Sequence, residues 1–154
     1  MESRELYQDI ILDHGRKPRN FHALDHPSHF AHGHNPLCGD RVTVFLAIDG
    51  DRIKDVSFDG RGCAISTASA SIMTEILKGK TLAEANALFD RFRASVTGEG
   101  DDSAPPGLED EMDRLAPLAG VKSYPARVKC ATLAWHAFET ALKSGAVGAT
   151  VKTE

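Results

Sequence analysis

The sequence predicts an α+β fold, with a small antiparallel three-stranded sheet and helices packed on one face. Two segments of alternating apolar residues, 41–49 and 53–58, are joined by Asp49-Gly50, a pair typical of tight hairpin turns. Longer segments before and after them have apolar residues at helical spacing. A chain of 154 residues can build one real core, so we expect a single domain over 1–145 and a flexible tail over 146–154.

The composition argues against several classes of function. A formal net charge of -4 disfavours general nucleic-acid binding, which needs a basic face. The chain has no apolar run long enough to span a membrane, and no apolar signal segment follows its first residues. Three cysteines are an odd number, which disfavours a disulfide framework and favours reduced thiols. We therefore expect a cytoplasmic protein, and a monomer because no heptad pattern indicates a self-interface.

The first part of the chain is expected to contain a helix, an irregular segment and the sheet. Residues 3–15 have an apolar face at helical spacing, with Ser3 as a cap and Gly15 as the end of the helix. Residues 20–37 follow no periodic pattern. Besides the two strands already described, a third short strand is weakly indicated near 61–64.

The irregular segment is rich in histidine, with His22, His26, His29, His32 and His34. Imidazoles are common metal ligands, so a second metal site is one interpretation of this cluster. A polar loop that faces solvent is the simpler interpretation, and we favour it because the spacing is irregular.

The later part of the chain is expected to be mainly helical. A helix rich in Ala and Ser spans 66–78, with Ser66 or Thr67 as its cap. Thr81 and Glu84 form a capping box that opens another helix, which ends before a glycine at position 98. A proline in its first turn indicates a last helix that begins near residue 125.

An acidic stretch separates these helices. Residues 98–111 contain six acids and no bases among Gly and Pro. We favour a plain surface loop over a partner-facing one, because runs of charge are usually solvated. A short helical turn is expected at 112–115.

The three cysteines all lie at the edges of expected elements. Cys38 precedes the first strand, Cys63 precedes the Ala/Ser helix, and Cys130 lies in the first turns of the last helix. Asp40 is two residues from Cys38 and points to the same side of an extended chain. Three thiolates and one carboxylate repel one another unless a cation lies between them, and they form a tetrahedral ligand set suited to zinc. For Cys38-Gly39-Asp40 alone, a free thiol beside a turn would be the simpler interpretation.

Six segments resemble the iron–sulfur cluster assembly family that includes IscU and the N-terminal domain of NifU. The resemblance extends over about residues 3–143 and is nearest to the SufU branch of that family. The segments are Arg4-Glu5-Leu6-Tyr7, Ile11-Leu12-Asp13-His14, Lys17-Pro18-Arg19-Asn20, Asn35-Pro36-Leu37-Cys38-Gly39-Asp40, Gly60-Arg61-Gly62-Cys63-Ala64-Ile65-Ser66 and Arg127-Val128-Lys129-Cys130-Ala131-Thr132-Leu133.

Two features indicate the SufU branch. The acidic stretch near 98–120 resembles the insertion that separates this branch from IscU. Lys129 stands at the position where IscU-like scaffolds have a histidine before the last cysteine. The resemblance implies the SufE/NifU-like fold.

The resemblance also implies a ligand set and a reaction. Cys38, Asp40, Cys63 and Cys130 would hold zinc. Cys38 would accept persulfide sulfur from a cysteine desulfurase of the SufS type, stimulate that enzyme, and pass sulfur to a downstream iron–sulfur assembly scaffold. Arg127 resembles a basic residue near the site, and binding of the partner or the sulfur is its expected catalytic role.

Three functions stay open at this point. The first is the sulfur carrier, and the second is a scaffold that builds a [2Fe–2S] cluster on the same ligands. The third is a small domain in which zinc is structural. A hard carboxylate ligand favours a site that must open over a closed structural site. Arg127 and Lys129 also flank Cys130, which favours its thiolate form.

Overall fold

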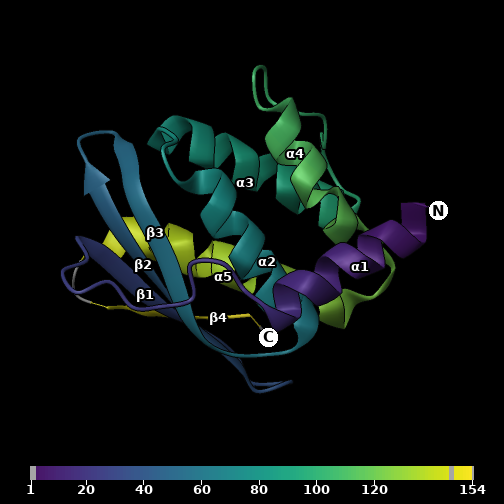
Figure 1. Cartoon of the computed structure of the whole chain (residues 1–154), viewed down its shortest axis with the longest axis horizontal. Coiled ribbons are helices and arrows are strands. Elements are labelled where there is room, and N and C mark those ends of the chain that lie inside the picture. Colours follow the sequence, from purple (N-terminus) through teal and green to yellow (C-terminus); the bar gives the residue numbers. More distant parts are fainter. Residues whose placement is uncertain (1–2, 146–147, 154) are drawn as a thin grey trace.

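A four-stranded sheet forms one layer of the molecule (Figure 1). The computed structural model describes residues 3–145 and 148–153, with side chains from residue 6 onward. The strand order is β3-β2-β1-β4, with β1 antiparallel to β2, β2 antiparallel to β3, and β4 parallel to β1. The strands are β1 (His29–Asn35), β2 (Asp40–Asp49), β3 (Arg52–Arg61) and β4 (Thr150–Lys152).

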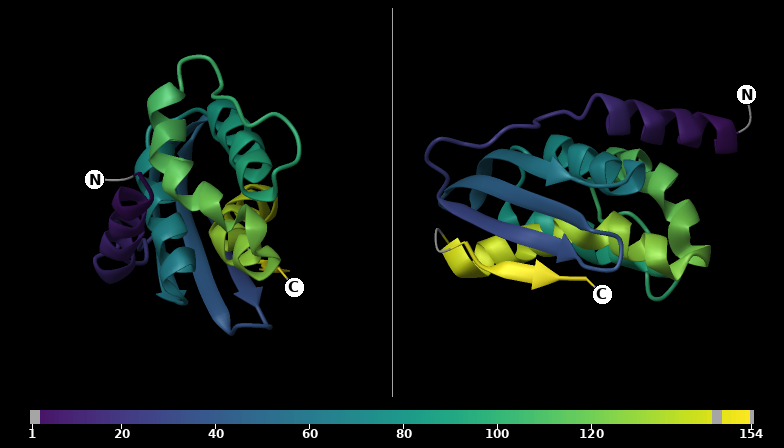
Figure 2. Two further views of the ribbon diagram at one scale, coloured as in Figure 1. Left: turned by 90° about the vertical axis from the view of Figure 1, so that its right-hand side faces the viewer. Right: turned by 90° about the horizontal axis from the view of Figure 1, so that it is seen from below.

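Helices cover one face of this sheet (Figure 2). Helix α5 packs on β1 and β2, helix α2 packs on β3 and on α5, and helix α1 lies on the outer side of α2. The core between the layers contains the fully buried rings of Phe89, Phe92, Trp135 and Phe138. The helices are α1 (Ser3–Arg16), α2 (Ala64–Leu77), α3 (Leu82–Thr97), α4 (Glu109–Leu115), the 3-10 segment η1 (Ala116–Ser123) and α5 (Pro125–Ser144).

The expected three-stranded sheet is wrong, because the sheet has four strands. Seven residues of the segment expected to be irregular form strand β1, and no separate strand forms at 61–64, where β3 ends and α2 begins. The inward residues of β1 are Ala31, Gly33 and Asn35, so the strand lacks the large apolar side chains that reveal alternation. Close packing explains the glycine at position 33, because a Cβ there would lie 3.0 Å from Val42 Cγ1 and 3.1 Å from Leu133 Cδ1.

The fourth strand comes from the segment for which no packing pattern was expected. Thr150–Lys152 pairs with β1, and the Thr153 N–H donates to the His34 carbonyl at 3.0 Å. The flexibility of the tail, and the division of the chain at residue 145, stay predictions.

Most helix boundaries follow the signals in the sequence. The Thr81–Glu84 capping box forms, and Gly98 ends α3 in the left-handed conformation with φ 75°. Helix α1 extends one residue past Gly15, to Arg16, and the expected cap at Ser3 lies outside the described side chains. Among the helices in the described ranges, none has the length and apolar character that a membrane crossing needs.

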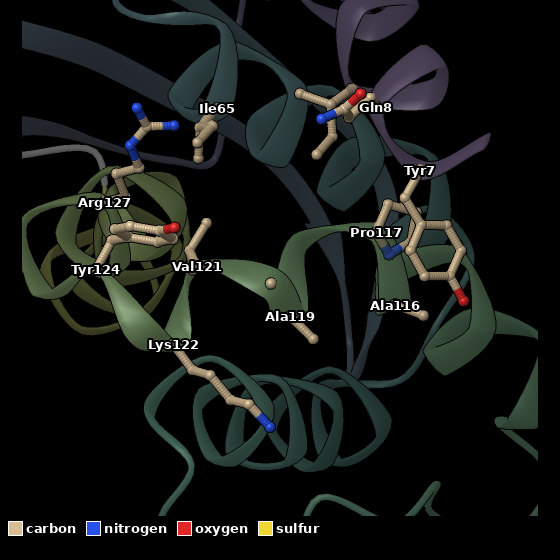
Figure 3. Close-up of a pocket in the computed structure, with 12 residues that line it drawn as sticks. Tyr7, Gln8, Ile65, Ala116, Pro117, Ala119, Val121, Lys122, Tyr124 and Arg127 are labelled. Carbon is tan, nitrogen blue, oxygen red and sulfur yellow. The ribbon is translucent and has the colours of Figure 1, made fainter. Parts of the chain in front are cut away.

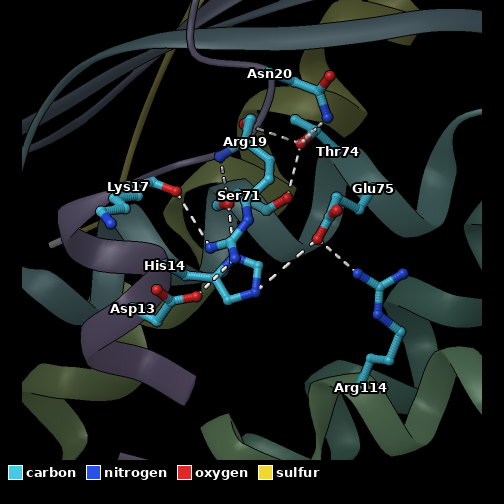
Figure 4. Close-up of polar contacts among 9 residues, drawn as sticks. All are labelled: Asp13, His14, Lys17, Arg19, Asn20, Ser71, Thr74, Glu75 and Arg114. Carbon is cyan, nitrogen blue, oxygen red and sulfur yellow. Dashed lines mark hydrogen bonds and ion pairs between the residues drawn. The ribbon is translucent and has the colours of Figure 1, made fainter. Parts of the chain in front are cut away.

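A polar network joins α1 to α2 and α4 (Figure 4). The ring nitrogen Nδ1 of the buried His14 lies 2.7 Å from Ser71 Oγ, and the Arg19 N–H donates to the same hydroxyl at 2.9 Å. Glu75 lies between His14 Nε2, at 3.9 Å, and the Arg114 guanidinium, at 2.6 Å. The network therefore fixes the outer helices to α2, the helix that Cys63 caps.

Candidate metal centre

Cys38 lies at the tip of the hairpin between β1 and β2, where Asn35 pairs with Asp40. The Asn35 side-chain oxygen accepts the Leu37 N–H at 3.1 Å, and its carbonyl accepts the Gly39 N–H at 2.8 Å. Gly39 has φ 78°, a left-handed conformation that glycine adopts without strain. These bonds turn the loop back on itself and leave Cys38 exposed at its end.

Asp40 connects this hairpin to the start of α2. Its side chain is buried at the first position of β2, and Oδ1 accepts the Cys63 N–H at 3.0 Å. Its other oxygen, Oδ2, lies 3.6 Å from Cys63 Sγ. Gly62 permits this approach, since a Cβ there would lie 3.1 Å from Asp40 Oδ1. The Asp40 carboxylate therefore binds the Cys63 N–H with one oxygen and faces the Cys63 sulfur with the other.

Cys63 is itself the N-cap of α2. Its Sγ accepts the Ser66 N–H at 3.4 Å, in the place where Ser or Asn caps usually put an oxygen. The expected caps, Ser66 and Thr67, lie inside the helix instead. A sulfur at this position lies at the positive end of the helix dipole.

Cys130 approaches from the third element, the first turns of α5. It is buried, with its Sγ 4.0 Å from Cys38 Sγ and 3.6 Å from the Ala126 carbonyl oxygen. Burial raises the pKa of the Cys130 thiol well above its usual value, and the neighbouring Cys63 thiol and Asp40 carboxyl raise it further. The expectation that nearby cations favour this thiolate is therefore wrong for the protein without metal.

The two cations near Cys130 point elsewhere. The Arg127 guanidinium lies over the Tyr124 ring, 5.6 Å from its centroid. Lys129 lines a separate groove along α5 together with Arg93 and Lys152. The expected role of Arg127 stays a prediction.

The donor atoms of Cys38, Asp40 and Cys130 all lie within 4.8 Å of one another. Cys63 falls outside this group but contacts Asp40 directly. Usual zinc bond lengths and tetrahedral angles place two sulfurs about 3.8 Å apart and a sulfur and an oxygen about 3.6 Å apart. The sulfur separation of 4.0 Å and the sulfur–oxygen separation of 3.6 Å are close to these values. The residues present therefore fit zinc, and the mutual repulsion of their acidic groups is what a divalent cation relieves.

The histidine-rich segment does not join this centre. Within the described residues, the group that satisfies the ligand separation contains no histidine. His32 Nδ1 lies 2.8 Å from Thr43 Oγ1, and His29 Nδ1 lies 2.8 Å from Ser28 Oγ.

A groove of about 690 Å³ lies beside the centre, between α1, η1 and the first turn of α5 (Figure 3). Tyr7 lines one end, and Ile65, Tyr124 and Arg127 line the other. Ile65 is two residues from Cys63, so the groove opens next to the candidate ligands.

Known proteins are similar to this chain in sequence and in fold. Residues 6–131 match the NifU-like N terminal domain. The chain is 42% identical over 135 residues to the zinc-dependent sulfurtransferase SufU of Bacillus subtilis, which covers 87% of each chain. It is 39% identical to the iron–sulfur cluster assembly scaffold protein IscU of Streptococcus pyogenes, over 92% of this chain and 85% of that one.

A crystal structure is also similar. It is described as a candidate iron–sulfur cluster assembly scaffold protein for the SUF system, from Fervidobacterium islandicum. The TM-score is 0.80 at 35% identity, with 92% of this chain and 99% of that chain covered.

Proposed function

Because the chain belongs to the NifU-like N-terminal domain family, we propose that it is a sulfur carrier of iron–sulfur cluster assembly. It takes persulfide sulfur from a cysteine desulfurase of the SufS type and passes it to a downstream assembly scaffold. The observation that carries the proposal is the exposed thiol of Cys38 on a hairpin tip, against two buried groups, Asp40 and Cys130. The likeness to a zinc-dependent sulfurtransferase supports the same function.

The transfer is an exchange at sulfur. The Cys38 thiolate attacks the outer sulfur of the desulfurase persulfide, and a new S–S bond forms at Cys38. The S–S bond of the desulfurase breaks, and its cysteine leaves as a thiolate. The sulfane sulfur keeps its oxidation state, so the step needs no oxidant or reductant.

Cys38 is the residue that we assign to this attack. Its loop is held by the hydrogen bonds of Asn35 and by a left-handed Gly39, whereas Cys130 is buried within α5. Cys63 is held at both its N–H and its sulfur, by Asp40 and by the start of α2. A short loop opens at lower cost than a packed helix, so Cys38 moves while the other residues stay in place.

Zinc is the metal that we propose for Cys38, Asp40, Cys63 and Cys130, and when bound it keeps their thiols deprotonated at neutral pH. Without such a cation, the buried Cys130 holds its proton, because its pKa is raised. Arg127 lines the groove beside Ile65, where we propose that it binds the partner or the transferred sulfur.

A cluster scaffold is the second candidate, favoured by the likeness to an assembly scaffold protein. One observation weighs against it. Lys129, next to Cys130, is a charged ammonium that lines another groove, so the chain offers no nitrogen ligand there for iron.

The proposal includes the cellular compartment and the oligomeric state of the protein. All three cysteines are free, as expected for a reducing compartment such as the cytoplasm. We further propose a monomer with one functional domain.

Isotope-labelled sulfur tests the function. A desulfurase supplied with labelled cysteine should place the label on Cys38, as mapped by mass spectrometry of the zinc-loaded protein. The Cys38→Ser variant should keep zinc on its three remaining ligands but lose the label and the stimulation of the desulfurase. A label that persists in that variant, on Cys63 or Cys130, would overturn the assignment. Stoichiometric iron and sulfide in protein purified without air would favour the scaffold.

A further inference from the structure

Three arginines lie next to the candidate ligands in the sequence. Arg41 follows Asp40 directly, Arg61 lies two residues before Cys63, and Arg127 lies three residues before Cys130. We name Arg41, Arg61 and Arg127 the cationic rim.

The two strand residues of the rim lie side by side. Arg41 and Arg61 are directly paired across β2 and β3, at the end of the sheet where the site lies. Like charges directly opposite each other are destabilising in a sheet. Both side chains are exposed, and Asp59, two residues along β3, makes no ion pair with either. Local packing therefore gives no reason for this pair of charges.

Several cations elsewhere in the molecule are paired with acids. Arg19, Lys78, Lys80, Arg91 and Arg114 each lie within 4.0 Å of a carboxylate. Among the residues that the structure describes, the three members of the rim make no such pair, and neither do some other exposed cations, such as Lys54 and Lys122. The charge of the rim is free to act on another molecule.

One acidic stretch lies at the opposite end of the protein. Figures 1 and 2 (left) show the β1–β2 hairpin at one end of the molecule and the loop that follows α3 at the other. That loop belongs to the acidic stretch 98–111, in a chain whose formal net charge is -4. The acidic stretch therefore lies away from the end of the molecule that carries the site and the rim.

We infer that the cationic rim docks on an acidic surface that surrounds the sulfur-bearing cysteine of the donor protein. The inference rests on the proposed function and adds the chemistry of the partner. A positive face on a negative protein steers an acidic partner to the correct end and turns the acidic loop away from it. The exposed side chains of Leu37, 74% exposed, and Tyr124, 60% exposed, lie within this face and supply apolar contact once the charges have brought the surfaces together.

Charge variants at Arg41 and Arg61 test the inference. We expect the zinc-loaded double variant Arg41→Gln/Arg61→Gln to bind the desulfurase about 2- to 30-fold more weakly at low salt, from the usual strength of exposed ion pairs. The difference from wild type should shrink in 0.5 M salt, because salt screens exposed charges, as titration calorimetry would show. The variant Arg41→Lys/Arg61→Lys keeps both charges and should bind as wild type does.

A matched control removes the same charge elsewhere. Lys54→Gln/Lys143→Gln changes two exposed lysines on β3 and at the far end of α5, and should leave the affinity unchanged. Zinc content and melting temperature should be equal in all variants. Sulfur uptake from an uncharged alkyl persulfide, whose thiol leaves as its outer sulfur passes to Cys38, should also stay unchanged.

The outcomes separate this inference from the proposed function. If wild-type protein takes sulfur from the desulfurase with an affinity that salt does not change, the rim has no role and the inference is wrong. Equal weakening by the glutamine and lysine variants, or by the control pair, would also overturn it. If wild-type protein takes no sulfur from the desulfurase or the alkyl persulfide, the proposed function fails.

Discussion

The side-chain oxygen of Asn35 accepts the backbone N–H of Leu37 at 3.1 Å, and this bond shapes the loop that carries Cys38. The Asn35 side chain is buried, so its removal leaves the Leu37 N–H without its hydrogen-bond acceptor in the turn. We expect Asn35→Ala to lower the free energy of unfolding by about 1–3 kcal/mol and to weaken zinc binding, measured by competition with a chromophoric chelator. Asn35→Ser creates a similar cavity but keeps an acceptor for the same N–H, and should be milder. Equal effects of the two variants would show that the bond does not position the loop.

Removal of zinc should lower stability. A ligand that binds only the folded state at about 1,000 times its dissociation constant adds about 4 kcal/mol. For a chain of this size, that corresponds to a shift of roughly 8–16 °C in melting temperature. Calorimetry with and without chelator measures the shift. The Cys130→Ala variant lacks the buried thiol and should show a much smaller one. An unchanged melting temperature in wild-type protein would contradict a contribution of the metal to folding.

Lys129→His should increase retention of an iron–sulfur cluster. The imidazole supplies a neutral nitrogen donor next to Cys130, where the wild type has an ammonium. Iron and sulfide content after anaerobic reconstitution measures the effect. Lys129→Gln removes the charge without adding a good ligand, so it separates the two causes. Stable retention of a full cluster by wild-type protein would show that the lysine does not disfavour the cluster.

His14 should make stability depend on pH. Burial, with a smaller effect of Arg19, lowers the pKa of His14, so the folded protein keeps the ring neutral. The unfolded chain binds a proton below about pH 6.5, so stability falls as pH decreases from about 7 to 5, by up to about 1.4 kcal/mol per pH unit. His14→Asn keeps a polar group for Ser71 and should flatten this dependence in urea unfolding. His136, whose pKa is also lowered by burial, leaves a residual slope. An equal slope in variant and wild type would exclude His14 as a source.

The elements with strong local signals could be predicted from the sequence, and those set by distant packing could not. The hairpin at Asp49-Gly50 and the capping box at Thr81 depend on neighbours in the chain, and both form as expected. Strand β1 is different, since its inward positions are small because Leu133 of α5 and Val42 of β2 take the space. Strand β4 has three residues, and its pairing partner lies far back in the sequence. No local pattern reports such a contact.

The candidate site also has features that the sequence predicted and features that it did not. The shortage of thiols and their positions at element edges predicted that Cys38 and Cys130 meet, and their sulfurs lie 4.0 Å apart. The sequence did not reveal Cys63 as the cap of α2, because a sulfur rarely takes a place that Ser, Thr or Asp usually fills. The Cys-Ala-Ile-Ser order that starts at Cys63 puts Ser66 three residues on, and this spacing is the signal that could have found the cap.

The bond between Asp40 and the Cys63 N–H implies an order of assembly. The bond joins the hairpin to α2 through protein atoms alone, so it holds two of the candidate ligands together independently of a metal. The donor atoms of Cys38, Asp40 and Cys130 already lie within 4.8 Å of one another, so the Cys63 side chain is the one that has to turn inward to complete the set. Loading should then proceed as a fast encounter whose rate grows with metal concentration, followed by rotation of that side chain. A newly made chain would not have to wait for metal before its helices pack, and an emptied one could be refilled without passing through the unfolded state.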